Sequence, residues 1–319
     1  MRNPKINMFY RPEMVLNDNR TNNYSRSPEK PRLLRDFLKA SGLYSNFNEI
    51  SDWEPFTRED FLTAHTAEYV DNFFAGIPHD CVSNGLKWSA QFADSVRYTN
   101  ASLYCAVKNS LEEPRTVAFS PTSGFHHARP YCGSGFCTFS GQVIASLKLY
   151  RDRRAVGAYI DLDGHFGNSI EDAREFTCGD LDLAVPPGFN INPEGVHARY
   201  ISDLREKLTM LEEELTAGGI DYVVFCHGAD SHEWDQLGSQ CTTEEWLECS
   251  KMVYSMIRRV ENHLRRPIPL TLALFGGYRD DDYDSVLNLH AADLALCLNI
   301  ICGLKISFNP IVLKPGKKS

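Results

Sequence analysis

Short apolar runs alternate with longer helical stretches along most of the 319 residues. The runs are the length of strands, and the stretches between them are long enough for helices. Repeated strand, helix and strand units build a parallel sheet with helices on both of its faces. The sequence therefore predicts a three-layer α/β fold with a mostly parallel central sheet. Besides a first short strand at Ile6–Tyr10, the predicted strands are Thr116–Ser120, Ala155–Asp161, Leu181–Val185, Tyr222–His227 and Pro269–Phe275.

Three helices are predicted between and after these strands. Apolar residues recur on one face from Tyr200 to Leu215, and Gly218 and Gly219 follow as a stop signal. Thr242 and Glu245 have the spacing of a capping box, which predicts that a second helix begins there. The third helix is predicted within 285–302. No internal repeat or long Gly/Ser/Pro linker divides the chain, so we predict a single domain over residues 1–319.

Composition narrows the classes of function. The formal net charge is -9, which disfavours binding to a nucleic-acid backbone. The ten cysteines are scattered without a Cys-x-x-Cys pair, and we interpret them as buried, reduced thiols. The sequence contains neither a signal peptide nor an apolar run long enough to span a membrane, so we expect a cytoplasmic protein. Residues 17–28 and 314–319 are expected to be loose, and the oligomeric state is left open.

Polar side chains collect just after four of the predicted strands. Ligand sites in α/β sheets lie at the carboxyl ends of the strands, so these side chains are expected at one edge of the sheet. Each group alone can be explained by a structural role, such as a polar loop or a helix cap. Together they bring carboxylates, imidazoles and a phenol to the same edge. The four groups are Gly124-Phe125-His126-His127-Ala128, Asp161-Leu162-Asp163-Gly164-His165, Gly228-Ala229-Asp230 and Gly276-Gly277-Tyr278.

Asp163, His165 and Asp230 are the candidate metal ligands. If the chain stays extended after Asp161, alternation sends Asp163 and His165 to the same side, and Asp230 can join them from a neighbouring strand. Three protein ligands with an open position are typical of catalytic zinc. The same ligands would also accept iron(II) or another divalent ion.

At these residues the sequence resembles the zinc-dependent histone deacetylase family, including its bacterial acetylpolyamine amidohydrolase and acetoin-utilisation relatives. The resemblance implies an arginase/deacetylase-like fold. The motifs arrive in family order along nearly the whole chain. Besides the four groups above, they are Ser27-Pro28-Glu29-Lys30-Pro31-Arg32-Leu33, His65-Thr66-Ala67-Glu68-Tyr69-Val70, Ser134-Gly135-Phe136-Cys137, and Asp235 with Leu237-Gly238.

The resemblance also implies roles for these residues. It makes His127 the general base and acid, with Asn168 as its partner. His126 becomes electrostatic support, with Asp161 as its partner. It further implies one catalytic Zn²⁺ and a K⁺ ion near Asp161. The remaining roles are Tyr278 as oxyanion donor, and Gly135 and Phe136 as lining of the substrate tunnel.

Two departures from the family pattern stand beside these matches. Phe166 occupies a position where the family usually has a second histidine, and Asn168 resembles class II-like members. The family's Pro-Gly-Thr-Gly tunnel loop is replaced by residues 186–193, which leaves Phe189 as the candidate for the second aromatic wall.

The resemblance implies a zinc-dependent amidohydrolase that removes an acetyl or longer acyl group, with acylated lysine in a peptide or protein as the expected substrate. An acylated polyamine or other small amine is the first alternative. A ureohydrolase with two manganese ions is a second enzyme alternative, and a catalytically silent zinc-bound module that binds acyl-lysine or a partner is the third. Neither a nucleic acid nor a membrane is expected as a partner.

Overall fold

A single seven-stranded sheet forms the centre of the computed structural model, which describes residues 2–16 and 24–313. The strand order is β2-β1-β3-β7-β6-β4-β5, and every pairing is parallel. The predicted α/β class with a parallel sheet is therefore confirmed. The strands are β1 (Ile6–Phe9), β2 (Phe47–Ile50), β3 (Ala118–Ser120), β4 (Gly157–Asp161), β5 (Asn190–Ile191), β6 (Tyr222–Cys226) and β7 (Leu270–Ala273).

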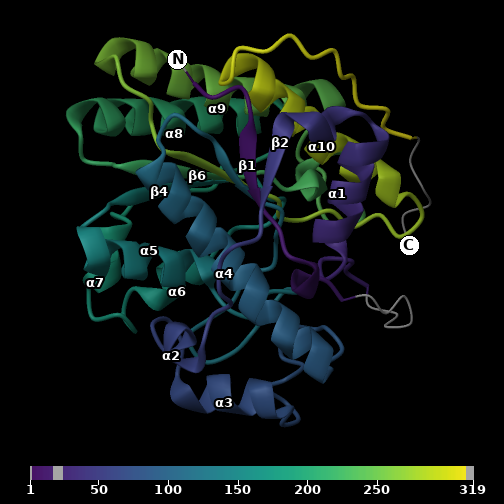
Figure 1. Ribbon diagram of the computed structural model, residues 1–319, viewed down its shortest axis with the longest axis vertical. Helices are drawn as coiled ribbons and strands as arrows, with labels where there is room; N and C mark the ends of the chain where they lie inside the picture. The colour runs from purple at the N-terminus through teal and green to yellow at the C-terminus, as the bar shows by residue number, and fades with distance from the viewer. Residues whose placement is uncertain (1, 17–23, 314–319) are drawn as a thin grey trace.

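Helices cover the sheet in two layers (Figure 1). On one side α4 packs against α5 and against β1, β3 and β7, and α5 packs against α7. On the other side α9 packs between α8 and α10, and α1 packs against α10. The helices are α1 (Lys30–Ala40), α2 (Arg58–Phe61), α3 (Ala67–Ala75), α4 (Ala90–Glu112), α5 (Gly141–Arg153), α6 (Ser169–Ala173), α7 (Asp180–Ala184), α8 (Ala198–Ala217), α9 (Thr243–Leu264) and α10 (Tyr283–Ile300).

The three predicted helices form where their sequence signals place them. The apolar face of α8 is buried, and the helix ends at Gly218, whose φ of 84° suits a residue without a Cβ. At the start of α9, Thr242 and Glu245 form the predicted capping box. The helix predicted within 285–302 corresponds to α10. None of the helices in the described part of the chain is long and apolar enough to cross a membrane. All ten cysteines are free, and six of them are buried.

The predicted strand Leu181–Val185 is wrong, because residues 180–184 form the short helix α7. Leu181 and Ala184 are buried and Leu183 is exposed, which is helical spacing rather than strand alternation. Arg174 holds the end of this helix by donating to Val185 O at 2.9 Å. The edge of the sheet beside β4 is formed instead by β5, which is too short to give a sequence signal. The strand β2 was also missed.

The sheet order places the four strands with polar ends side by side. They are β3, β7, β6 and β4, which are consecutive neighbours in the sheet. Since all of them are parallel, the segments that follow them emerge at the same edge. Of the segments expected to be loose, 17–23 and 314–319 lie outside the described residues.

Candidate active site

Asp163 and His165 follow β4, but the strand ends at Asp161 and the chain bends afterwards. The prediction that they meet by strand alternation is therefore wrong in its cause, although their meeting is observed. The bend is held by Asp163 Oδ1, which accepts from the backbone N–H of His165 at 3.0 Å. The turn folds the imidazole back over Asp163, and its Nδ1 lies 3.0 Å from the same Oδ1. A turn stabilised by an aspartate side chain, rather than an extended strand, pairs the two residues.

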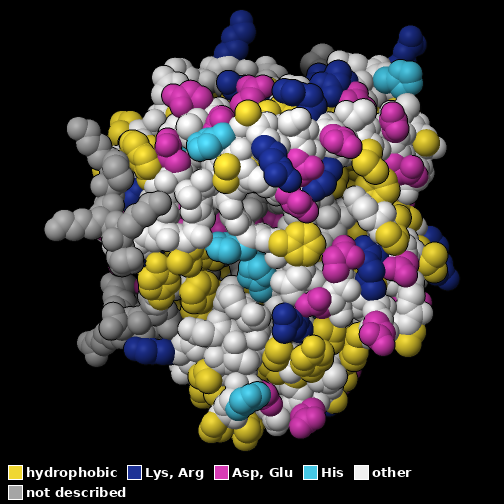
Figure 2. All heavy atoms as spheres, turned by 180° about the vertical axis from the view of Figure 1, so that it is seen from behind, with side chains coloured by type: hydrophobic (Ala, Val, Ile, Leu, Met, Phe, Trp, Pro, Cys, Tyr) yellow, Lys and Arg dark blue, Asp and Glu magenta, His cyan; other side chains and the backbone are white. Residues whose placement is uncertain are grey.

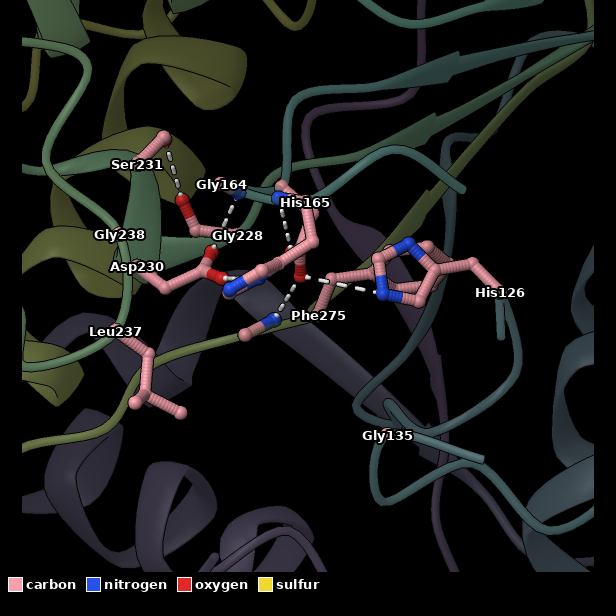
Figure 3. Close-up of polar contacts among 12 residues, drawn as sticks. His126, Gly135, Gly164, His165, Gly228, Asp230, Ser231, Leu237, Gly238 and Phe275 are labelled. Carbon is pink, nitrogen blue, oxygen red and sulfur yellow. Dashed lines mark hydrogen bonds and ion pairs between the residues drawn. The ribbon is translucent and has the colours of Figure 1, made fainter. Parts of the chain in front are cut away.

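Asp230 completes the group from a single 3₁₀ turn, η3 (Ala229–Ser231), that follows β6. Its Oδ2 lies 3.0 Å from His165 Nδ1. One ligand atom from each of Asp163, His165 and Asp230 lies within 4.8 Å of the other two. The three predicted ligands are thus brought together, and Figure 3 shows His165 pointing toward Asp230.

The electrostatics of this group suit a divalent cation. Both carboxylates are buried. Burial, together with the neighbouring Asp163 charge, raises the pKa of Asp230 well above its ordinary value. Hydrogen bonds to Asp163 and Asp230 raise the pKa of His165 to about 10. Two buried carboxylates this close are costly unless a positive charge lies between them. The donor set of two carboxylates and one imidazole therefore fits a zinc ion.

Glycines allow the backbone to approach these carboxylates closely. Gly276 N donates to Asp163 Oδ2 at 2.7 Å, and Gly164 N donates to Asp230 Oδ1 at 3.0 Å. A Cβ at Gly276 would lie 2.2 Å from Asp230 Cγ. The side of Gly276 that faces Asp230 therefore has no room for any side chain.

The tandem histidines lie on the loop after β3. Their ring centroids are 4.0 Å apart. Figure 3 shows His126 on the far side of His165 from Asp230. His126 Nδ1 lies 2.9 Å from Asp161 Oδ2, and His126 Nε2 lies 3.6 Å from Asp163 Oδ2. Burial would lower the pKa of His126, but Asp163 and Asp161 outweigh it and raise this pKa to about 9.

His127 has a neutral partner instead of a carboxylate. Its Nδ1 lies 2.8 Å from Asn168 Oδ1. The amide orientation of Asn168 is defined, because its Nδ2 donates to Asp172 Oδ2 at 2.5 Å. His127 Nδ1 is therefore the protonated nitrogen, and Nε2 is left as the base. Burial and the adjacent His126 lower the pKa of His127 to about 4.

Phe136 and Tyr278 line a pocket above these groups, together with Gly135, His126 and Asp163. The ring centroids of Phe136 and Tyr278 are 5.5 Å apart. A Cβ at Gly135 would lie 2.6 Å from His127 Cδ2. Phe136 has a φ of 63°, uncommon for a bulky residue, and its N–H donates to Asn84 O at 2.8 Å.

Histidine side chains are visible in a hollow on the face shown in Figure 2, with hydrophobic side chains to either side. Two exposed aromatic residues border the site. Phe166 follows His165 directly and is 55% exposed. Tyr24 is 45% exposed and stacks on Phe136, with ring centroids 6.2 Å apart. The Tyr24 hydroxyl donates to Gln236 Oε1 at 3.3 Å.

Phe189, the expected second wall, is not brought to the site. It immediately precedes β5, at the amino end of that strand, and packs against the hydrophobic core. Its carbonyl accepts from Tyr159 N at 2.8 Å, which fixes it beside the middle of β4. The site forms at the opposite, carboxyl ends of the strands. Residues 186–193 include β5 itself, and this strand holds Phe189 at the sheet.

Two charged residues at the site had no role in the sequence interpretation. Lys30 is fully buried in the first turn of α1, and its Nζ donates to the carbonyls of Phe275 and Gly276. Burial lowers the pKa of Lys30 to about 8. Asp235 accepts from the backbone N–H groups of Tyr278 at 2.7 Å and Leu237 at 2.9 Å. Both residues occur inside recognised motifs, but only the folded chain shows that they support the turn carrying Tyr278.

His65 supports the segment that carries Gly135 and Phe136. Its Nδ1 lies 2.9 Å from Arg129 O, and its Nε2 accepts from Ser140 N at 2.9 Å. These two contacts fix a neutral imidazole protonated at Nδ1. Burial lowers the pKa of His65 to about 4. The ring thus joins the two ends of the loop over residues 129–140.

Comparisons with known proteins agree with this geometry. Residues 24–177 match the model of the histone deacetylase domain. Histone deacetylase RPD3 of Saccharomyces cerevisiae is 29% identical over 168 residues, which are 47% of this chain and 38% of that protein. Histone deacetylase 8 of Xenopus tropicalis is 25% identical over 184 residues, 52% of this chain and 48% of that protein. The chain thus spans less than half the length of these two relatives.

Two further comparisons cover more of the chain. An uncharacterised protein of Picosynechococcus is 27% identical over 245 residues, 70% of this chain and 76% of that protein. A crystal structure of the HDA15 HD domain matches with a TM-score of 0.69 and 16% identity, over 97% of this chain and 91% of that one. This likeness shows a shared fold. The match to the histone deacetylase domain ends before Asp230 and Tyr278. The structure nevertheless places Asp230 beside Asp163 and His165, and Tyr278 in the pocket that Asp163 lines.

Proposed function

Because this chain belongs to the histone deacetylase domain family, we propose that it is a zinc-dependent deacylase that hydrolyses an N-acyl amide. The observation that carries the proposal is the group of Asp163, His165 and Asp230, with His165 Nδ1 3.0 Å from an oxygen of each carboxylate. These three residues would hold the ion. We place the activity in one catalytic domain over residues 1–319.

A zinc ion bound there would supply an activated water and polarise the acyl carbonyl. In this proposal His127 takes the water proton at Nε2 and returns it to the leaving amine. Its Nδ1–H is directed at Asn168 Oδ1, 2.8 Å away, so the ring keeps the tautomer in which Nε2 is the base. Asp161 orients His126 in the same way, at 2.9 Å.

Tyr278 is the donor that we assign to the developing oxyanion. It lines the same pocket as His126 and Asp163. Burial and the nearby Asp163 raise the pKa of Tyr278 well above its ordinary value, so the hydroxyl keeps its proton. A neutral hydroxyl can donate to negative charge that appears during the reaction.

The expected substrate is an acylated lysine, because the pocket is bordered by aromatic rings that suit a methylene chain. Phe136 is one wall, and we propose Tyr24 as an outer wall stacked upon it. Acylated polyamines and other small amines fit the same chemistry. The potassium ion near Asp161 also remains a proposal.

Asp235 bears on the ureohydrolase alternative. Its carboxylate is occupied by backbone N–H groups, including that of Tyr278 at 2.7 Å. Within residues 2–16 and 24–313, one group of three or more side chains has the geometry to hold an ion. Both observations favour a single ion.

The test is an activity screen over acyl-lysine peptides of increasing acyl length and over acetylated polyamines, with and without a chelator. We expect turnover that the chelator abolishes and added zinc restores. Asp230→Asn should lose both bound zinc and turnover, whereas Asp180→Asn, a half-exposed position on α7, should keep both. Full zinc loading without turnover on any substrate would instead favour the silent binding module, and two bound ions per chain would favour the ureohydrolase.

A further inference from the structure

A depression lined by five arginines lies at the end of the sheet opposite the active site. It adjoins the amino end of β7 and the end of α9, and encloses about 230 Å³. The chain as a whole carries a net charge of -9, so such a concentration of positive charge is unexpected. Its charged lining residues are Arg2, Arg115, Arg258, Glu261, Arg265 and Arg266.

At the floor of this depression Arg2 and Glu261 are buried and paired, and the partly exposed Arg258 also pairs with Glu261. Arg2 Nε donates to Glu261 Oε1 at 2.8 Å, and Arg258 Nη1 donates to Glu261 Oε2 at 2.7 Å. The backbone N–H of Ile268 also donates to Glu261 Oε1, at 3.1 Å. Both oxygens of Glu261 are therefore engaged, and this carboxylate cannot neutralise further arginines.

The other three arginines, Arg115, Arg265 and Arg266, are exposed around this floor. In the described part of the chain, no hydrogen bond or ion pair engages their guanidinium groups. The lining contains five arginines and one glutamate, so its formal net charge is +4. Like charges gathered in one hollow repel one another, and a bound anion would remove this cost.

Helix capping does not account for the whole arrangement. Arg265 is the C-cap of α9, with a φ of 53°, and cations near a helix C-terminus are favourable. Arg2 and Arg115, however, come from two other segments, before β1 and before β3. Three separate parts of the chain thus supply guanidinium groups to one depression.

We propose that this depression binds a small anion with two or more phosphate groups. Guanidinium forks bind phosphate oxygens in pairs, which makes several arginines in one hollow a phosphate site. The negative charge of the whole chain disfavours a long polyanion such as a nucleic acid. The anion is either an inorganic oligophosphate or the phosphate chain of a nucleotide.

Isothermal titration calorimetry at constant ionic strength tests the proposal, with inorganic pyrophosphate, tripolyphosphate and ATP as probes. We expect saturable 1:1 binding with a dissociation constant below about 1 mM, which corresponds to about 4 kcal/mol. Arg115→Gln and Arg266→Gln should each weaken binding at least tenfold. Neither change touches a paired group, so both variants should unfold at the parent temperature and keep the parent's deacylase rate.

Two controls separate this site from its alternatives. Arg205→Gln removes an exposed arginine on α8 and should leave binding unchanged. Asp230→Asn should also bind the probes like the parent, since the metal group lies at the opposite edge of the sheet. Equal affinity for tripolyphosphate and ATP would identify the ligand as an inorganic oligophosphate. Tighter binding of ATP would identify it as a nucleotide. Absence of saturable binding, an equal loss in Arg205→Gln, or a loss in Asp230→Asn would overturn the proposal.

Discussion

Replacement of Tyr278 by phenylalanine isolates the contribution of a single hydroxyl. The ring contacts with Phe136 at 5.5 Å and with His165 at 6.3 Å do not involve this hydroxyl, so phenylalanine can keep both. The backbone N–H of residue 278 still donates to Asp235, which holds the turn. The substitution should therefore leave the fold and the metal group intact and remove only the donor to the oxyanion.

The expected loss follows from removing one such donor. One preorganised donor is worth about 3–4 kcal/mol, so kcat should fall by roughly 10²–10³ with KM nearly unchanged. Kinetics on a fluorogenic acyl-lysine peptide would be measured beside zinc content and thermal unfolding of the same preparation. A kcat within threefold of the parent at full zinc loading would refute the oxyanion role. Loss of zinc would instead show that Tyr278 supports the metal group.

Three further changes test the surroundings of the site. Gly276→Ala should abolish zinc binding although every ligand remains, because the new Cβ would lie 2.2 Å from Asp230 Cγ. The metal content of the purified variant measures this effect, and a variant fully loaded with zinc would contradict the prediction. The pKa of His65 is about 4 when folded against an ordinary 6.5, so its contribution to stability is complete above pH 6.5 and is lost as the pH falls toward 4. The free energy of unfolding should fall by up to about 3 kcal/mol over this range. Urea titrations at several pH values should show that this free energy depends less on pH in His65→Gln than in the parent. Tyr24→Ala should raise KM for acyl-lysine peptides about tenfold, whereas Tyr24→Phe, which keeps the stack on Phe136, should not; equal KM values for both variants would exclude Tyr24 as a wall.

Local signals in the sequence were enough for the main elements of the fold. The apolar face from Tyr200 to Leu215 and the Thr242–Glu245 capping box each specify a helix from residues within a few turns of one another. The wrong strand prediction at Leu181–Val185 also came from a local signal. A five-residue apolar run fits a strand or a short helix equally well, and packing against α5 decides between them.

The candidate ligands were also accessible from the sequence, because ionisable residues directly after apolar strands are costly without a partner. The sequence could not show how they meet. Asp163 and His165 pair through a bend that one aspartate oxygen stabilises, and Asp230 arrives on a 3₁₀ turn 65 residues after His165. The prediction of a single domain stays a prediction.

By itself, the sequence determined the parallel α/β class and the identity of the residues that gather at the carboxyl edge, since both follow from order along the chain and from short-range periodicity. Only the tertiary structure decided that Phe189 packs against the core, that Lys30 and Asp235 hold the Tyr278 turn, and that five arginines share one hollow. Those contacts join segments that are distant in sequence. Their geometry depends on how whole helices and strands pack, and no local pattern encodes it.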